Sequence, residues 1–404
     1  MRILIVTPHF YPESFKCNDV AFELLHRGFE VEVMTAIPDY PIGHYFKGYG
    51  IFKRRREIVK GVKIYRSFII PRGKGGAIRL SLNYISYTIF SSLLSLWIGL
   101  TRKYDAIFVY ETSPIMVGIP AVIMKKMQHI PLLFWVQDLW PESLSAAGGI
   151  RNKRILSIFE TLTTWIYKNS DRILISSKGF KQSICNKGNF APKIDYFPNW
   201  IDAVLCNRPK ENFEIPSFPT GFIVMMAGNM GDAQDLPNVL QAAYRIKDHA
   251  NIHFVFVGEG RKKSWVESYV QEHELGKTVH CLGRFPLSVM PNLFDKADVL
   301  LLSLKDSEIF SLTVPSRLQA YMYAGKPIVA MINGEGERVV SDSKCGYSVR
   351  AGDYKSLADL LIRLSEEDKS VLQQMGLNGK LYSQKYYDFD NCIDNLVHKL
   401  HHLL

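Results

Sequence analysis

The chain has 404 residues, of which 47% are hydrophobic and 22% are charged, and its formal net charge is +10. This balance excludes a wholly disordered chain, and the length predicts two domains of about 200 residues each. The six cysteines include no C-x-x-C pair, and the N-terminus shows no signal-peptide pattern. We therefore expect reduced thiols and a cytoplasmic protein.

The positive charge belongs to the first half of the chain. Residues 1–200 hold 27 Lys and Arg against 14 Asp and Glu, a balance of +13, which leaves −3 for residues 201–404. Basic residues flank the apolar segment 80–100, for which three interpretations stay open. A helix packed in the first domain is favoured over one lying on an anionic membrane surface, and a membrane-spanning helix is the least favoured. Because no nucleic-acid-binding motif accompanies the basic residues, we expect no nucleic-acid partner.

Apolar strand-like runs alternate with amphipathic stretches, which is typical of parallel β/α/β units. The first-half pattern predicts strands at 2–7, 30–35, 106–110, 132–136 and 172–176, with a helix near 18–27. A second cycle of strands is predicted at 222–227, 253–258 and 299–302. Prolines and glycines between 208 and 221 indicate the linker. The predicted fold class is α/β, with two Rossmann-like halves.

The segment 307–330 predicts a phosphate-facing turn, a helix and a buried strand. A polar, irregular run precedes Pro315, whose fixed φ suits the first helical position. Backbone amides at a helix start favour an anion. The run from Gly228 to Gly231 follows a predicted strand in the same half, where glycines allow a diphosphate to approach the backbone. Taken alone, that G-x-x-G is more typical of a plain turn.

Three motifs together resemble one family. They read SLTVPSRLQAYMYAGKP from Ser311, AGNMGDAQ from Ala227 and WVQDLWPES from Trp135. They are similar to motifs of family-4-type glycosyltransferases with the GT-B fold, most of all to the bacterial O-antigen and capsule branch that transfers N-acetylfucosamine (FucNAc). The resemblance implies two Rossmann-like domains facing across a cleft. The acceptor domain would span 1–205 with the terminal helix 386–404 packed back on it, and the donor domain 206–385.

For the donor, the resemblance implies contacts from the glycine loop, from the loop Cys281 to Pro286 and from the phosphate-facing turn. The residues are Gly228, Asn229, Met230, Gly231, Gln234, Arg284, Phe285, Ser311, Leu312, Thr313, Ser316 and Arg317. For Arg284, an exposed side chain without such a role remains an alternative.

The chain departs from the wider family at three donor-side positions. Many relatives have an Arg, a Lys and the second Glu of an E-x7-E motif where this chain has Asn229, Gln234 and Ala320. Gln319 points about 100° away from Ala320 on a helix, so it is a poor substitute. Glu308 is the carboxylate nearest the first Glu of the motif and is a candidate catalytic residue beside the donor sugar. A solvated loop acid is an equal interpretation.

On the acceptor side, the candidate catalytic base is Asp138, which would accept the proton of the acceptor hydroxyl. The alternative is that Asp138 caps a helix. The resemblance also implies acceptor contacts by Glu13, Asp39, Tyr40 and Glu142.

The resemblance implies a hexosyltransferase-type enzyme with a UDP-sugar donor and a polyprenyl-diphosphate-linked saccharide acceptor. Family relatives generally retain the anomeric configuration. We expect a peripheral position on the anionic inner-membrane surface, and neither a cofactor nor a metal ion. The D-x-D triplet at 388–390 is expected to cap a helix. Two alternatives are a non-hydrolysing UDP-sugar 2-epimerase and a catalytically inactive scaffold derived from a transferase.

Overall fold

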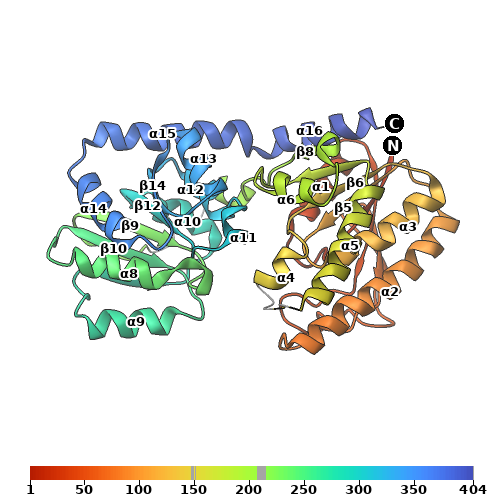
Figure 1. Cartoon of the computed structure of the whole chain (residues 1–404), viewed down its shortest axis with the longest axis horizontal. Coiled ribbons are helices and arrows are strands. Elements are labelled where there is room, and N and C mark those ends of the chain that lie inside the picture. Colours follow the sequence, from red (N-terminus) through yellow and green to blue (C-terminus); the bar gives the residue numbers. More distant parts are fainter. Residues whose placement is uncertain (147–149, 151, 207–214, 404) are drawn as a thin grey trace. The chain divides into compact units, whose positions relative to one another are not determined.

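A computed structural model describes residues 1–146, 150, 152–206 and 215–403 of the chain. The chain divides into two compact units, each built on one sheet with helices against it (Figure 1). Unit 1 comprises Met1–Pro198 and Cys392–Leu404, and unit 2 comprises Asn199–Asn391.

Unit 1 contains an eight-stranded sheet in the order β3-β4-β2-β1-β5-β6-β7-β8. Its strands pair in parallel except at one edge, where β3 runs antiparallel to β4. The strand order reverses between β1 and β5, and at such a switch point the loops leave a crevice outside the carboxyl ends of the strands. The strands are β1 Arg2–Val6, β2 Glu30–Ala36, β3 Arg56–Val59, β4 Val62–Ser67, β5 Ala106–Glu111, β6 Leu132–Val136, β7 Arg172–Ile175 and β8 Ile194–Tyr196.

The helices of unit 1 include the last helix of the chain, α16, most of which belongs to this unit. Arg27 pairs with Asp394 of α16, and Lys399 Nζ lies 3.0 Å from Asp195 Oδ1. The helices are α1 Lys16–His26, α2 Ala77–Thr101, α3 Gly118–Gln128, α4 Glu142–Ala146, α5 Lys153–Asn169, α6 Phe180–Asn186 and α16 Phe389–His402, with 3-10 turns at Ile115–Val117 and Ala191–Lys193.

Unit 2 contains a six-stranded parallel sheet in the order β11-β10-β9-β12-β13-β14, whose switch point lies between β9 and β12. Val224 and Met226 of β9 belong to one apolar cluster, whereas Ile223 and Met225 belong to another. Both faces of β9 are therefore buried, which explains its continuous apolar run. The strands are β9 Phe222–Ala227, β10 Ile252–Val257, β11 Val279–Gly283, β12 Val299–Ser303, β13 Ile328–Met331 and β14 Gly346–Val349.

The helices of unit 2 are mostly the crossovers that parallel pairing requires. They are α7 Ala203–Cys206, α8 Leu236–Arg245, α9 Lys263–Glu272, α10 Met290–Phe294, α11 Glu308–Ser311, α12 Ser316–Ala324, α13 Glu335–Ser343, α14 Tyr354–Ser365 and α15 Lys369–Tyr386, with 3-10 turns at Asp232–Gln234 and Leu287–Val289.

The α/β prediction is confirmed, and each strand predicted above is present. One local prediction is wrong: Pro315 is the N-cap of α12, with extended ψ of 132°, and the helix begins at Ser316. Asp388 caps α16 as expected, since its Oδ1 accepts the Asn391 N–H at 3.0 Å. The predicted linker at 208–221 lies largely outside the described residues.

The boundary of unit 1 falls before residue 199, whereas the prediction was residue 205. The Trp200 ring lies 5.2 Å from that of Phe389, and the Ile201 N–H donates to the Tyr387 carbonyl at 3.2 Å. These contacts tie the segment after Pro198 to the end of α15 and the start of α16.

Candidate active site

The loops after β9 and β12 flank the switch point of unit 2 and contact each other. Lys305 N–H donates to the Ala233 carbonyl at 2.9 Å, and the Ser303 hydroxyl donates to the Gln234 carbonyl at 2.5 Å. The first loop carries the glycine motif and the second leads into α12. The structure therefore brings together the two donor-side motifs predicted from the sequence.

Arg317 lies against the glycine loop. Its Nη2 donates to the Asn229 carbonyl at 3.2 Å, and a Cβ added at Gly228 would lie 2.8 Å from that nitrogen. Gly228 also has a φ of +124°, which L side chains rarely adopt. Glycine is thus required for both the backbone turn and the space that the guanidinium fills. This places a cation beside an exposed loop, as a diphosphate requires.

Gln234 is engaged within the loop itself. Its side-chain oxygen accepts the Gly231 N–H at 3.0 Å. This bond closes the 3-10 turn Asp232–Gln234, which follows the exposed Asn229. Gln234 therefore shapes the loop in this structure, and a direct donor contact by it stays a prediction.

The buried side of α12 holds the helix against neighbouring backbone. The Tyr321 hydroxyl accepts the Ala227 N–H at 2.7 Å and donates to the Ala227 carbonyl at 3.1 Å. Gln319 is buried and donates to the Asn199 carbonyl at 2.9 Å. Gln319 thus faces inward, in line with its being a poor ribose ligand. Tyr321 fixes α12 directly beneath the start of the glycine loop.

The turn before α12 uses its hydroxyl groups internally. Ser311 Oγ donates to the Glu308 carbonyl at 2.7 Å, and Thr313 Oγ1 donates to the Phe310 carbonyl at 3.0 Å. Leu312 is half-buried, and Ser316 is exposed at the first position of α12. The chemistry that this turn offers an anion is therefore mainly its backbone and Arg317. Glu308 is exposed at the start of α11, so its place beside the sugar stays a prediction.

Two predicted donor residues have side chains in the apolar core. Met230 is buried in one cluster of unit 2, and Phe285 packs against the other. The Met230 N–H also donates to the Glu259 carbonyl at 2.8 Å. Arg284, between Gly283 and Phe285, is exposed, as its alternative interpretation allows.

In unit 1, Asp138 follows β6 at the carboxyl edge of the sheet. Ser113 Oγ, from the loop after β5, donates to Asp138 Oδ2 at 3.1 Å, and Ser143 Oγ donates to Oδ1 at 2.5 Å. Trp140 Nε1 in turn donates to Ser113 Oγ at 3.1 Å. Burial raises the pKa of the Asp138 carboxyl, and the two serine hydroxyls offset part of that rise. The carboxylate is therefore held in one orientation and is more basic than an exposed aspartate.

Glu111 ends β5 and supports the backbone of Asp138. Its side chain is fully buried, and Oε2 accepts the N–H groups of Gln137 at 3.2 Å and Asp138 at 3.3 Å. Oε1 has no hydrogen-bond partner among the described residues. Burial raises the pKa of Glu111 well above its usual range, and the charge of Asp138 raises it further. Burial and the charge of Asp138 therefore both favour the protonated form of Glu111.

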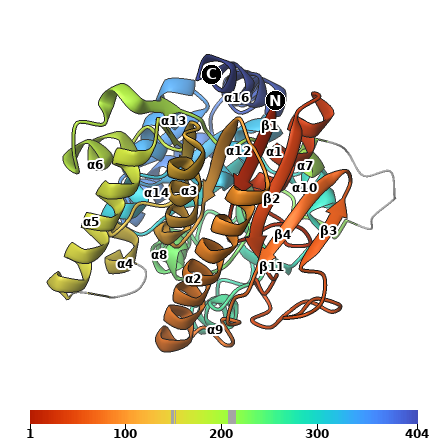
Figure 2. The ribbon, with the colours of Figure 1, turned by 90° about the vertical axis from the view of Figure 1, so that its right-hand side faces the viewer.

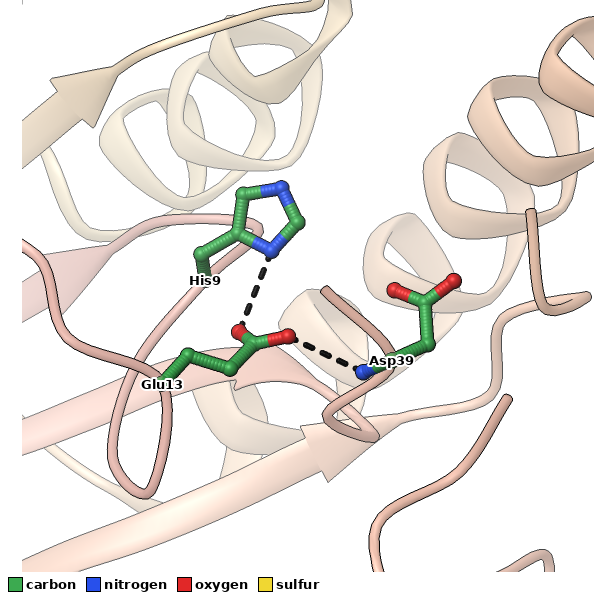
Figure 3. A group of neighbouring side chains, drawn as sticks. All are labelled: His9, Glu13 and Asp39. Carbon is green, nitrogen blue, oxygen red and sulfur yellow. Dashed lines mark hydrogen bonds and ion pairs between the residues drawn. The ribbon is translucent and has the colours of Figure 1, made fainter. Parts of the chain in front are cut away.

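The predicted residues Glu13 and Asp39 lie close to His9 in the loops that follow β1 and β2 (Figure 3). Glu13 Oε1 accepts the N–H groups of Asp39 at 2.9 Å and Tyr40 at 2.7 Å, and its Oε2 lies 3.1 Å from His9 Nδ1. Glu13 is buried, so it acts here by holding the Asp39–Tyr40 turn. A direct acceptor contact by Glu13 stays a prediction.

Arg72 completes this network. Its Nη2 lies 3.3 Å from His9 Nε2, and because a guanidinium only donates, Nε2 accepts and Nδ1 carries the proton that binds Glu13. The backbone N–H of Arg72 donates to Asp39 Oδ2 at 2.8 Å. Burial raises the pKa of Asp39. Arg72 Cζ lies 4.8 Å from the Tyr40 ring centroid. The exposed part of this network is the Tyr40 ring, 39% accessible, with Arg72 behind it.

The ligand atoms of His9, Glu13 and Asp39 lie within 4.8 Å of one another, close enough to hold a metal ion. However, both Glu13 oxygens and both His9 ring nitrogens already have hydrogen-bond partners, and Arg72 Nε lies 3.9 Å from Asp39 Oδ2. A second cation would compete with that guanidinium. The residues fit a hydrogen-bonded network better than a metal site.

One carboxylate oxygen of Glu142 is held by an ion pair at the start of α4. Its Oε1 accepts bonds from Lys187 Nζ at 2.5 Å and from Ser183 Oγ at 2.5 Å. The Lys187 side chain is almost fully buried, so this pair joins the start of α4 to the end of α6. The other oxygen, Oε2, has no hydrogen-bond partner among the described residues, and an acceptor contact by Glu142 stays a prediction.

Sequence reasoning did not identify the supporting roles of His9, Arg72, Glu111 and Tyr321. For Glu111, the signal is a carboxylate at the end of an otherwise apolar strand, next to the strand that leads to Asp138. The other three carry no such signal, because their roles depend on contacts between segments far apart in the chain.

Two family profiles match, one on each half of the chain. The profile described as "Glycosyl transferase 4-like domain" matches residues 17–200, and that described as "Glycosyl transferases group 1" matches residues 207–382. The chain is 25% identical over 295 residues to the probable glycosyltransferase WbjE of Pseudomonas aeruginosa, covering 71% of this chain and 72% of WbjE. It is 23% identical over 291 residues to the putative colanic acid biosynthesis glycosyl transferase WcaI of Escherichia coli, covering 68% and 70%.

Solved structures share the fold. HepE of Anabaena, in complex with UDP, superposes with a TM-score of 0.71 at 13% identity, covering 99% of this chain and 100% of that one. The order of the two sheets and the two profile matches agree with this architecture. The chain is an enzyme and belongs to the GT-B glycosyltransferases of the group 1, family-4-like type.

Proposed function

We propose that this enzyme transfers an N-acetylated 6-deoxy amino sugar, such as N-acetylfucosamine, from UDP to a saccharide carried on polyprenyl diphosphate. The product would extend an O-antigen or capsular polysaccharide, with retention of the anomeric configuration. Motif resemblance supports the sugar class, and the name of WcaI supports polysaccharide biosynthesis. The UDP in HepE supports the nucleotide.

Arg317 is the observation that carries the proposal. Arg317 is the second residue of α12, and its guanidinium contacts the carbonyl of Asn229 in the glycine loop. As the sugar leaves, negative charge builds on the departing diphosphate. A fixed cation and the amides of a helix start stabilise that charge more in the transition state than in the ground state. In this proposal they do so without a metal ion.

Asp138 would accept the proton of the acceptor hydroxyl. Ser113 and Ser143 hold its two oxygens, so little reorientation is needed. Its raised pKa makes it a stronger base than an exposed aspartate. The acceptor surface would include the exposed ring of Tyr40, and Arg72 beneath it suits a sugar diphosphate.

The test is acceptor-dependent transfer. The full-length enzyme is incubated with a panel of UDP-linked sugars and a short polyprenyl-diphosphate disaccharide, and the products are identified by mass spectrometry and NMR. We expect one added N-acetylated deoxyhexosamine with retained configuration, and none with Asp138→Asn. Conversion of a UDP-sugar without acceptor, or no product with any UDP-sugar, would overturn the proposal.

A further inference from the structure

Helix α2 has its polarity reversed relative to an ordinary surface helix. Its buried residues are mainly small or polar, with Tyr87 and Ile98 as exceptions, and its exposed side carries a continuous apolar row. A helix that faces water normally does the opposite. We call the exposed row the α2 stripe, and its members follow each other at spacings of three or four residues. They are Ile78, Leu82, Ile85, Ile89, Leu93, Leu96 and Leu100.

The inward face is specified by bonds that fix the rotation of the helix. Asn83 donates to Asp39 Oδ2 at 3.1 Å and to the Ile70 carbonyl at 2.7 Å. Ser86 accepts the Ile70 N–H at 2.9 Å. At Gly99, an added Cβ would lie 2.9 Å from the Met127 Cε of α3. Turning α2 to bury the stripe would break these bonds and this close approach.

The stripe is too long and too exposed to be scattered surface residues. At about 1.5 Å per residue, the span from Ile78 to Leu100 is roughly 33 Å. Ile78 is 81% exposed and Leu100 is 80% exposed, at its two ends. Contiguous apolar patches of this kind mark interaction sites. Figure 2 shows α2 beside α3 on the side of unit 1 that faces the viewer.

Cations flank the stripe at both of its ends. Residues 58–104 contain eight Lys and Arg and no Asp or Glu. Lys74 and Arg79 are exposed at the start of α2, and Lys103 is exposed just after its end. Near that end, Arg56 Cζ lies 4.3 Å from the Trp97 ring centroid. An apolar row flanked by cations is complementary to acyl chains beneath anionic headgroups.

We propose that the α2 stripe is the face by which unit 1 lies on an anionic lipid bilayer, with α2 parallel to the membrane plane. The choice of a bilayer over a second copy rests on the proposed function, since the acceptor is a membrane lipid, and on the cations that flank the stripe. By length and composition alone, α2 is apolar enough to cross a membrane. However, its other face packs on α3, β2 and β4 and is bonded to Asp39, so it remains part of the domain.

The test is co-sedimentation of the full-length protein with vesicles of phosphatidylcholine, alone or with 30% phosphatidylglycerol. The stripe variant is Ile85→Glu with Ile89→Glu. Its matched control is Leu377→Glu with Leu381→Glu, an equally spaced and similarly exposed pair on α15. A charge variant, Lys74→Glu with Lys103→Glu, is compared with Lys277→Glu and Lys355→Glu. Circular dichroism and UDP binding show that each variant is folded.

We expect salt-sensitive binding to the anionic vesicles, at least tenfold weaker with phosphatidylcholine alone. The stripe and charge variants should each lose at least tenfold in binding, while both controls bind like wild type. Three results would overturn the proposal: wild type staying in the supernatant, equal loss in variant and control, or a dimer in solution that the stripe variant dissolves. Resistance of the native membrane-bound protein to alkaline carbonate extraction would also overturn it, because that shows a spanning helix. Vesicle binding is measured without any sugar, so loss of transfer activity alone would count only against the proposed function.

Discussion

The carboxyl group of Glu111 accepts the backbone N–H of Asp138 at 3.3 Å, from the end of the neighbouring strand. The same oxygen accepts the Gln137 N–H at 3.2 Å. One buried side chain therefore fixes the turn that presents the candidate base. A neutral acceptor suffices for these two bonds.

Replacing Glu111 tests this positioning role. Glu111→Gln keeps an acceptor oxygen, so we expect kcat within about threefold of wild type. Glu111→Leu leaves the Asp138 N–H without its acceptor, at a cost of roughly 1–3 kcal/mol of unfolding free energy, while the Gln137 N–H keeps its bond to the backbone carbonyl of residue 111 at 3.0 Å. With Asp138 also misplaced, kcat should fall about 10- to 100-fold while the KM for the UDP-sugar changes little. Steady-state kinetics and chemical unfolding measure both effects, and equal damage by Gln and Leu would contradict the account.

The raised pKa of Glu111 also predicts how stability depends on pH. Above the unfolded value of about 4.5, the unfolded chain has lost this proton while the folded chain keeps it. The folded state then binds more protons, so the free energy of unfolding should fall as pH rises until the folded pKa is reached. The slope is at most about 1.4 kcal/mol per pH unit. The free energy of unfolding is measured at several pH values from 5 upward for wild type and Glu111→Gln. It should fall with pH more steeply in wild type, by at most this slope, and an equal pH dependence of the two proteins would contradict the prediction.

Asp138→Asn removes the candidate base but keeps its size. We expect kcat to fall about 10²- to 10⁴-fold, the usual contribution of a positioned base. UDP affinity, measured by calorimetry, should be unchanged because the donor motifs lie in unit 2. In wild type the rate should fall on acidification through a pKa above that of an ordinary aspartate. A variant with near-normal kcat would instead support the helix-cap interpretation of Asp138.

Arg317→Ala removes the cation against the glycine loop. Charge-assisted bonds contribute about 1.5–3 kcal/mol, so UDP affinity should fall roughly 10- to 150-fold. Arg317→Lys should recover only part of this, because an ammonium group lacks the planar fork. The matched control is Arg245→Ala, an exposed arginine on α8 paired with Asp359, which should leave UDP affinity unchanged. Equal affinity of Arg317→Ala and wild type would remove the main support for the donor site.

Patterns that depend on local chemistry were predictable from the sequence. The apolar runs of β1 and β9 identified central parallel strands, since both faces of such strands are buried. The two donor motifs came together because each follows a strand beside the switch point. The hydrogen bonds of Gln234 with Gly231, and of Glu142 with Ser183 and Lys187, were not predictable from the sequence, because they depend on how the loops and helices fold.

Composition alone could not predict which face of α2 is buried. Its apolar content favoured a packed helix, but rotation is decided by partners such as Ile70 and Asp39, which lie elsewhere in the chain. In the sequence, the serines of α2, Ser91 and Ser95 among them, interrupt the apolar run. In the structure Ser86, Ser91 and Ser95 are buried, whereas Ser81 is exposed.

The central claim is that unit 2 binds a UDP-linked donor, and thermal unfolding of the full-length protein with UDP, GDP, dTDP or ADP tests it most directly. No metal is added. A ligand at about 100 times its dissociation constant adds roughly 2.7 kcal/mol of stability, which raises the Tm by a few degrees. We predict that UDP alone gives this shift and that Arg317→Ala cuts the stabilisation at the same concentration to about half or less, as a 10- to 150-fold loss of affinity requires. A shift with another nucleotide but not UDP, or with none of the four, would contradict the account.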